Sequence, residues 1–243
     1  MFRTTEKYPL NNKKLRQALS YSIDRKAIVD NVFHNCGAPA MSPLSPPLSL
    51  RMGACFKDNN ITLAKRLFEE ALQELGLTRE ALPEIELRYV ADLAVQHRAA
   101  QAIQDQWRKA LGIKNIRLRK AGWPEHFDRV TKGDFGLGFM GWNSSVLDAS
   151  FILEVFRNKE DASNKSNWEN AKFQKCLDRA NLTINEIERV NLLIEAEDIL
   201  MDEMPILPLC SINKRFAKKP KLNGEALSSL QFIDFKSAYF RPE

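Results

Sequence analysis

The chain has 243 residues, with 36 Lys and Arg against 31 Asp and Glu, and a formal net charge of +5 at pH 7. Hydrophobic residues make up 44% and charged residues 28%, which is a globular composition and excludes a disordered or fibrous chain. No apolar run is long enough to cross a bilayer. The length allows one large domain or two small ones with a real core.

The cysteines and the basic residues argue against a zinc site, a disulfide framework and a nucleic-acid partner. The four cysteines are widely spaced, which matches neither a zinc pattern nor a dense disulfide framework and favours free thiols. The densest basic cluster lies within residues 214–221. Such a cluster can contact nucleic acid, but lysines that keep a strand edge solvated are the commoner case. We therefore expect no nucleic-acid partner.

Residues 15–29 predict two consecutive helices. Apolar side chains recur at helical spacing and form one stripe, at Leu15, Ala18, Leu19 and Ile23. Asp24 is positioned to cap the second helix, and Ile23 and Ile28 flank the cap as a hydrophobic staple. We expect a helix, a cap and a second helix packed on a core.

A proline-rich stretch separates this pair from the next helix. Residues 37–47 hold four prolines, which predicts an extended and irregular loop. Asn60 then suits the N-cap of a helix, and Gly76 is a natural C-cap for it.

The periodicity next alternates between strand and helix. Residues 85–90 alternate as in a half-buried strand, Val95 to Leu111 follows a helical stripe that ends at Gly112, and residues 113–118 alternate again. A right-handed crossover with parallel strands follows from this order. A short helix is predicted from Pro124 to Thr131. We predict three parallel strands, near residues 85–90, 114–119 and 135–141.

The rest of the chain is mainly helical. Residues 151–156, 171–182 and 186–201 each carry apolar stripes, and Asn185 with Glu188 resembles a capping box. Met204 to Cys210 predicts a late strand. The whole pattern predicts an α/β fold, with a mostly parallel sheet flanked by helices.

Motifs that would indicate an enzyme are missing from the sequence. The three histidines, His34, His97 and His126, have no metal-binding spacing. There is no G-x-S-x-G elbow and no P-loop, and the glycines at 133–138 precede a strand instead of following one. We predict no catalytic residue, no metal site and no cofactor.

Two tryptophans are better candidates for a binding site. Trp123 opens a helix after a strand, and Trp142 ends a strand after Gly141. Ligands in open α/β sheets bind at such strand ends. Spacing alone also allows both tryptophans to be ordinary core residues.

Several segments, in order, carry a resemblance to a known family. Residues 15–29, with Arg16, Asp24 and Arg25, resemble the signature of family 5 bacterial extracellular solute-binding proteins of the oligopeptide type, which serve ABC transporters. Further segments match the same family, namely 64–76, 132–142, 166–177, 204–209 and 213–220. The resemblance implies one lobe of a type II periplasmic-binding-protein architecture. Residues 1–224 correspond to the C-terminal, peptide-binding lobe, and residues 225–243 to a tail that would return to the N-terminal lobe, which the resemblance does not cover.

The same resemblance implies a ligand site. In the family the two matching tryptophans line the cavity between the lobes, and an acidic residue three positions after the second one holds the ligand's amino group. Here Ser145 stands at that position, and Asp148 is the nearest acid. The cationic positions with which peptide-binding relatives hold the ligand's carboxylate correspond here to Val130 and Phe139. Arg129, next to Val130, is the cation that could take over this role. The predicted substrate-binding residues are Trp123, Phe139, Trp142, Asn143, Ser145 and Asp148.

The implied function is the substrate-binding component of an ABC transporter for oligopeptides or dipeptides, with a peptide ligand and a membrane permease as partners. Because some members of the family carry nickel complexes or haem, these are alternative ligands for this chain. Two alternatives remain: a truncated relic that binds nothing, and an interaction module whose cleft is completed by a separate chain. The family location is the periplasm or cell envelope. The N-terminal segment lacks the apolar core of a secretory signal, so a truncated reading frame would be cytoplasmic.

Overall fold

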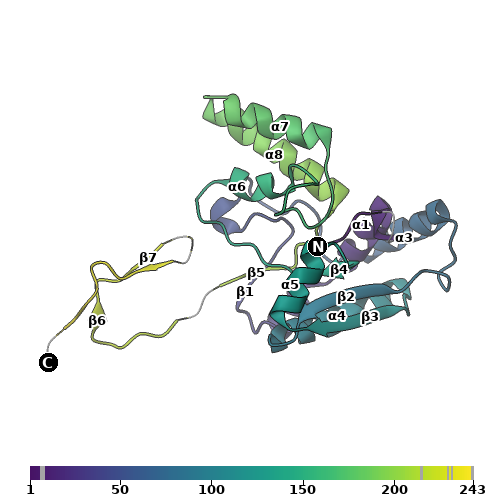
Figure 1. Ribbon diagram of the computed structural model, residues 1–243, viewed down its shortest axis with the longest axis horizontal. Helices are drawn as coiled ribbons and strands as arrows, with labels where there is room; N and C mark the ends of the chain where they lie inside the picture. Colours follow the sequence, from purple (N-terminus) through teal and green to yellow (C-terminus); the bar gives the residue numbers. More distant parts are fainter. Residues whose placement is uncertain (6–8, 214–215, 229, 231, 242–243) are drawn as a thin grey trace.

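The computed structural model describes residues 1–5, 9–213, 216–228, 230 and 232–241 (Figure 1). Its α-helices are α1 (Lys13–Tyr21), α2 (Arg25–Asn31), α3 (Ile61–Leu75), α4 (Ala94–Leu111), α5 (Trp123–Thr131), α6 (Ala149–Leu153), α7 (Ala171–Leu182) and α8 (Glu186–Glu203). Short 3₁₀ turns are η1 (Pro9–Asn11), η2 (Pro46–Leu48) and η3 (Glu154–Phe156). Its strands are β1 (Gly37–Pro39), β2 (Ile85–Val90), β3 (Ile116–Ala121), β4 (Leu137–Gly138), β5 (Cys210–Ile212), β6 (Leu222–Asn223), β7 (Ala226–Leu227), β8 (Ile233–Asp234) and β9 (Tyr239–Phe240).

The central sheet has the order β3-β2-β4, and both pairings are parallel. Helix α4 connects β2 to β3, so the predicted parallel crossover is confirmed. The register sets Ile85 opposite Ile116, and Leu87 opposite Leu137. β3 begins at Ile116, two residues later than predicted, and β4 keeps only two residues of the expected strand at 135–141.

The core lies between this sheet and the first helices and continues into α6, α7 and α8. The predicted stripe of α4 is buried, and the indole Nε1 of Trp107 donates a hydrogen bond to the Leu19 carbonyl oxygen over 2.8 Å. Asp24 caps α2 through the Ala27 N–H, as predicted. Gly112 ends α4 with a φ of 70°, a left-handed conformation that disfavours other residues. Local signals therefore place the helix ends correctly.

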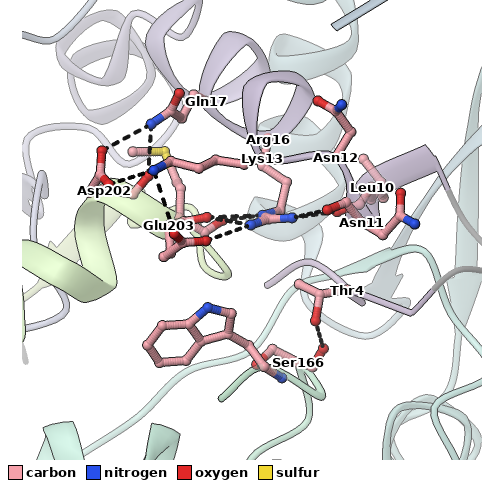
Figure 2. A network of polar contacts seen from close by, with 12 residues as sticks. Thr4, Leu10, Asn11, Asn12, Lys13, Arg16, Gln17, Ser166, Asp202 and Glu203 are labelled. Atoms are coloured by element: carbon pink, nitrogen blue, oxygen red, sulfur yellow. Dashed lines mark hydrogen bonds and ion pairs between the residues drawn. The ribbon is translucent and has the colours of Figure 1, made fainter. Parts of the chain in front are cut away.

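Both arginines of the 15–29 segment, Arg16 and Arg25, are buried, and Arg16 binds the end of α8. Arg16 donates from Nε and Nη2 to the carbonyl oxygens of Glu203 and Met204 at the end of α8 (Figure 2). Its Nη1 bonds the carbonyl oxygens of Leu10 and Asn11. Burial lowers the pKa of Arg16 to about 10. The free carbonyls at the end of α8 thus receive their donors from α1.

The predicted strand from Met204 to Cys210 is wrong in its position. β5 begins only at Cys210, where the expected strand ends, and pairs antiparallel with β1. Pro205 and Pro208 carry no N–H, so the preceding segment lacks two of the donors that a continuous ladder needs. β1 itself lies in the proline-rich stretch that was expected to be irregular. Its pairing with β5 shows that a distant partner can order such a segment.

Helices α7 and α8 form an antiparallel hairpin that extends beyond the rest of the lobe (Figure 1). Asn185 caps α8 by accepting from the Glu188 N–H over 3.0 Å. The Glu188 side chain bonds Arg179 and Thr183 instead of returning to Asn185. The capping box is therefore present only in its first half.

The tail after β5 forms two short antiparallel ribbons, β6 with β9 and β7 with β8. It projects away from the helices and the central sheet, toward the left of Figure 1. Its exposed apolar side chains are Phe216, Leu227, Phe232, Phe235, Tyr239 and Phe240. In the predicted basic cluster, Lys218 forms an ion pair with Glu225, and Lys214 and Arg215 lie outside the described residues.

Candidate functional site

The two predicted tryptophans leave the central sheet at one edge. Trp123 is the first residue of α5, directly after β3 and Gly122. Trp142 follows the short strand β4. Because β3 and β4 run parallel on either side of β2, their carboxyl ends lie at the same edge.

This edge is rich in exposed apolar side chains. Trp123 is 52% exposed and Trp142 is 36% exposed, so neither is a buried core residue. The other exposed apolar residues that follow these strands are Leu93, Phe127, Val146 and Leu147. We call these six residues the aromatic edge. Single exposed hydrophobics are common, and six that follow adjacent strand ends are the candidates for a binding surface.

Trp123 is supported by its own helix. Its ring stacks on His126 with 6.3 Å between centroids, and lies 5.7 Å from the ring of Phe127. His126 is fully buried, and its Nε2 lies 2.8 Å from the Phe139 carbonyl oxygen. Since a carbonyl can only accept, Nε2 carries the proton and Nδ1, which has no hydrogen-bond partner, is unprotonated. This neutral imidazole ties α5 to the end of β4.

Phe139 continues β4 toward the edge. Its backbone N–H donates to the Arg88 carbonyl oxygen over 2.9 Å, and its half-buried ring packs on the core. The Arg88 side chain is buried, with Nη1 2.7 Å from Glu86 and Nη2 3.5 Å from Glu125. Sequence reasoning missed Arg88. The signal in the sequence was weak, because Arg88 alternates with apolar residues in the same way as Glu86 does.

The loop after Trp142 has a defined shape. The indole of Trp142 packs against Phe156, with 5.9 Å between centroids. Ser144 is buried and its Oγ lies 2.5 Å from the Val146 carbonyl oxygen. The predicted site residues Asn143 and Ser145 flank it and are exposed.

Asp148, the acid nearest to the Ser145 position, ends this loop as the N-cap of α6. Its Oδ1 accepts from the Ser150 N–H over 2.9 Å and from the Ser150 Oγ over 2.8 Å. Its Oδ2 accepts from Nη2 of Arg189 over 2.7 Å. Burial opposes its ionisation, but the Ser150 hydrogen bonds and the Arg189 charge prevail and lower its pKa. Arg189, on α8, was also missed from sequence.

The cation proposed for a ligand carboxylate lies elsewhere. Arg129 occupies the last turn of α5, which runs back from the aromatic edge, and it forms an ion pair with Asp134 ahead of β4. Val130 beside it is buried. Arg129 is therefore near the opposite edge of the sheet from Trp123 and Trp142.

A shallow depression of about 400 Å³ lies between α7 and α8. It is lined by Arg179, Asn185, Ile187, Glu188, Asn191, Leu192 and Glu195. None of the predicted site residues lines it. In the described part of the chain, no helix is both long and apolar enough to cross a membrane.

The chain resembles curated transport proteins over nearly its whole length. It is 35% identical to the oligopeptide-binding protein OppA of Bacillus subtilis, over 98% of this chain and 44% of that protein. It is 27% identical to heme-binding protein A of Haemophilus influenzae, over 95% of this chain and 42% of that protein. The chain thus spans less than half the length of these relatives.

Solved structures support the fold. The substrate-binding domain of an oligopeptide ABC transporter from Bacillus anthracis matches 99% of this chain with a TM-score of 0.80 at 21% identity, over 48% of its own length. A peptide-binding protein of a peptide ABC transporter matches 86% of this chain and 95% of its own, with a TM-score of 0.77 at 24% identity. The fold is that of the type II periplasmic binding proteins.

The family itself is shown by its model. The model described as "Bacterial extracellular solute-binding proteins, family 5 Middle" matches residues 1–164, which include the arginine-bearing helix pair, the central sheet and the aromatic edge. Members of this family that resemble the chain are solute-binding transport proteins and not enzymes. With the predicted topology present and the family segments in order, this chain belongs to the family 5 bacterial extracellular solute-binding proteins.

Proposed function

We propose that this chain supplies one wall of the ligand cleft in the substrate-binding component of an ABC transporter for peptides. The observation that carries the proposal is the aromatic edge, where Trp123 and Trp142 stand exposed at the ends of β3 and β4. The ligand lies against these rings, with Phe139, Asn143, Ser145 and the segment to Asp148 beside it.

The transport role follows from closure of two lobes. The other lobe covers the aromatic edge when a ligand is bound, by a hinge motion that removes apolar surface from water. The closed form then delivers the ligand to a membrane permease, and no covalent bond changes. The place of action is the periplasm or the cell envelope.

The tail serves the second lobe in this proposal. Residues 225–243 return to it, and the exposed Phe235, Tyr239 and Phe240 pack against its surface. Isolated two-stranded ribbons are marginally stable in water, and such ribbons gain stability from a covering surface. The chain's share of its relatives, 44% for the Bacillus subtilis protein, leaves enough sequence in those proteins for a second lobe.

A peptide is the proposed ligand because the relatives at 35% and 25% identity are named for oligopeptides and dipeptides. Other relatives are named for haem and deoxycholate, so amphipathic molecules form the second ligand class. The apolar character of the aromatic edge suits the non-polar part of either class.

Titration by NMR tests the proposal on the 243-residue chain. A hydrophobic tripeptide should shift the indole N–H signals of Trp123 and Trp142 with a Kd no tighter than about 1 mM, since one wall buries only part of the ligand. The signal of Trp107, whose N–H bonds Leu19, should stay fixed. Micromolar binding would show that one lobe is a complete site.

Matched variants locate the binding surface. Trp123→Ala and Trp142→Ala should each abolish the shifts of the remaining edge tryptophan. Leu182→Ala removes a more exposed apolar side chain, at 84%, on the α7–α8 hairpin, and should leave these shifts unchanged. Shifts that persist in both tryptophan variants would contradict the proposal.

A second candidate is an interaction module completed by a separate chain, favoured by the exposed apolar side chains of the tail. It predicts that the isolated chain binds a hydrophobic dye and associates in solution. Replacing Phe235 and Phe240 by Ser should remove both properties. A dye-free, salt-independent monomer by light scattering would count against this candidate.

A further inference from the structure

We propose that the ion pair between Arg189 and Asp148 withholds the Asp148 carboxylate, at the end of the loop after Trp142, from the ligand. The aromatic edge then binds the apolar part of a ligand without requiring a free amino group. This inference rests on the proposed function, because it concerns the specificity of the same surface.

The carboxylate in question is unique within its loop. Residues 139–148 contain one acidic side chain, Asp148. Both of its oxygens are engaged: Oδ1 accepts two hydrogen bonds from Ser150, and Oδ2 lies 2.7 Å from Nη2 of Arg189. These three contacts occupy most of the roughly four acceptor positions of an ionised carboxylate, and the guanidinium lies beside the one that is left.

The engagement of Asp148 is structural. Its hydrogen bond to the Ser150 N–H caps α6, and its partner Arg189 belongs to α8, 41 residues further along the chain. The two side chains are only 39% and 31% exposed. A ligand ammonium at Asp148 would approach the like charge of the Arg189 guanidinium. Displacing that guanidinium would only exchange one charge-assisted hydrogen bond for another.

The surroundings of the aromatic edge also disfavour a cation. The ammonium of Lys165 lies 5.5 Å from the ring centroid of Phe127, which itself packs on Trp123. An incoming ammonium at these rings would therefore face a positive charge. An acetylated or otherwise uncharged end does not have this disadvantage.

Another carboxylate near this edge is Asp92, which is exposed just after β2, the central strand. It supplies the competing explanation for any preference that the chain shows for a free amine. The experiment includes Asp92→Asn to separate the two carboxylates.

The test compares trileucine with N-acetyl-trileucine. The dissociation constants come from the indole N–H shifts of Trp123 and Trp142 in the full 243-residue chain. For the parent chain we expect a ratio of the two constants of about 1, within twofold. In Arg189→Gln the released Asp148 should favour the free amine by about threefold, the value of one partly exposed ion pair.

Two further variants complete the comparison. Arg189→Lys keeps a cation beside Asp148, so its ratio should stay at the parent value. Arg189→Gln combined with Asp148→Asn should return the ratio to about 1, because the released carboxylate is gone. A merely structural role of Arg189 changes stability and leaves the ratio of the two ligands unchanged.

Each contrary outcome is distinct. If the parent chain binds free trileucine more than about fivefold more tightly than the acetylated peptide, an unpaired carboxylate binds the ligand's ammonium group and the inference is wrong. Loss of that preference in Asp92→Asn would assign the role to Asp92. An unchanged ratio in a folded Arg189→Gln variant also overturns the inference. If neither peptide shifts the two tryptophans, the proposed function fails instead.

Discussion

Arg25 and Asp58 form a largely buried ion pair that joins four segments of the lobe. Nη1 of the fully buried Arg25 lies 2.8 Å from Oδ1 of Asp58, and Oδ2 of Asp58 accepts the backbone N–H of Arg25 over 3.0 Å. The same guanidinium donates to Ser20 in α1 and to the Pro208 carbonyl oxygen ahead of β5. One side chain therefore links α1, α2, the segment before α3 and the segment before β5.

Removing Asp58 should strongly destabilise the fold. Asp58→Ala leaves the Arg25 charge buried without its counter-ion, and we expect a loss of about 3–5 kcal/mol in the free energy of unfolding. Urea denaturation measures this. Lys26→Ala breaks the exposed pair with Asp30 and should cost less than about 1 kcal/mol. Equal losses in the two variants would show that the buried pair has no special weight.

Gly37 should be irreplaceable in β1. Its φ of 144° is unfavourable for other residues, and a Cβ there would collide with the Ser211 carbonyl oxygen of β5. Gly37→Ala should cost about 1–3 kcal/mol and separate the two strands. Hydrogen exchange at the Ala40 N–H, which bonds the Leu209 carbonyl, should accelerate.

Gly53 offers a matched control for this substitution. It also has a positive φ, 99°, but a Cβ there meets no atom within 4 Å. Gly53→Ala should therefore leave exchange at Ala40 unchanged. If the Ala40 N–H exchanges at the same rate in the two alanine variants, the close approach of Ser211 does not hold β1 in place.

His126 should make the lobe sensitive to mild acid. Burial lowers its pKa below 6.5, the hydrogen bond to Phe139 opposes this, and the charge of Arg88 adds to the lowering. Since the unfolded chain binds a proton more readily, stability is full above pH 6.5 and falls as the pH drops through the folded pKa. The slope is at most about 1.4 kcal/mol per pH unit.

A substitution isolates this contribution. His126→Gln keeps an N–H donor for the Phe139 carbonyl and should flatten the loss of unfolding free energy between pH 7 and pH 5. His34→Gln, at an exposed histidine, should retain the parent slope. Parallel slopes for parent and His126→Gln would assign the acid sensitivity to other groups.

The cysteines should differ in their reactivity toward iodoacetamide. Burial raises the pKa of Cys210 to about 11 and, with the nearby Glu197, that of Cys55 to about 12. At pH 8 the thiolate fraction, and with it alkylation, should be about tenfold lower at Cys55 than at Cys210. Peptide mass spectrometry follows the order, and rapid labelling of Cys55 in the native chain would contradict it.

Local features of this protein followed from its sequence alone. The caps Asp24, Asn60, Gly76 and Gly112 stand where their residue types suggest, because a cap depends on backbone groups a few positions away. The change from alternating to helical periodicity located β2, α4 and β3, and the helical crossover between the two strands predicted that they run parallel. The position of Trp123 and Trp142 was foreseeable for the same reason, since each lies directly after a predicted strand.

The partners of the charged side chains were decided by the tertiary structure. Arg16 bonds a carbonyl 187 residues away, and Arg189 bonds Asp148 across 41 residues, separations that no local period encodes. The late strand shifted to Cys210 because pairing with β1 outweighed an apolar run interrupted by prolines. Periodicity determines which face of an element is buried. Which group contacts that face depends on how distant elements pack. The availability of the Asp148 carboxylate depends on the same packing.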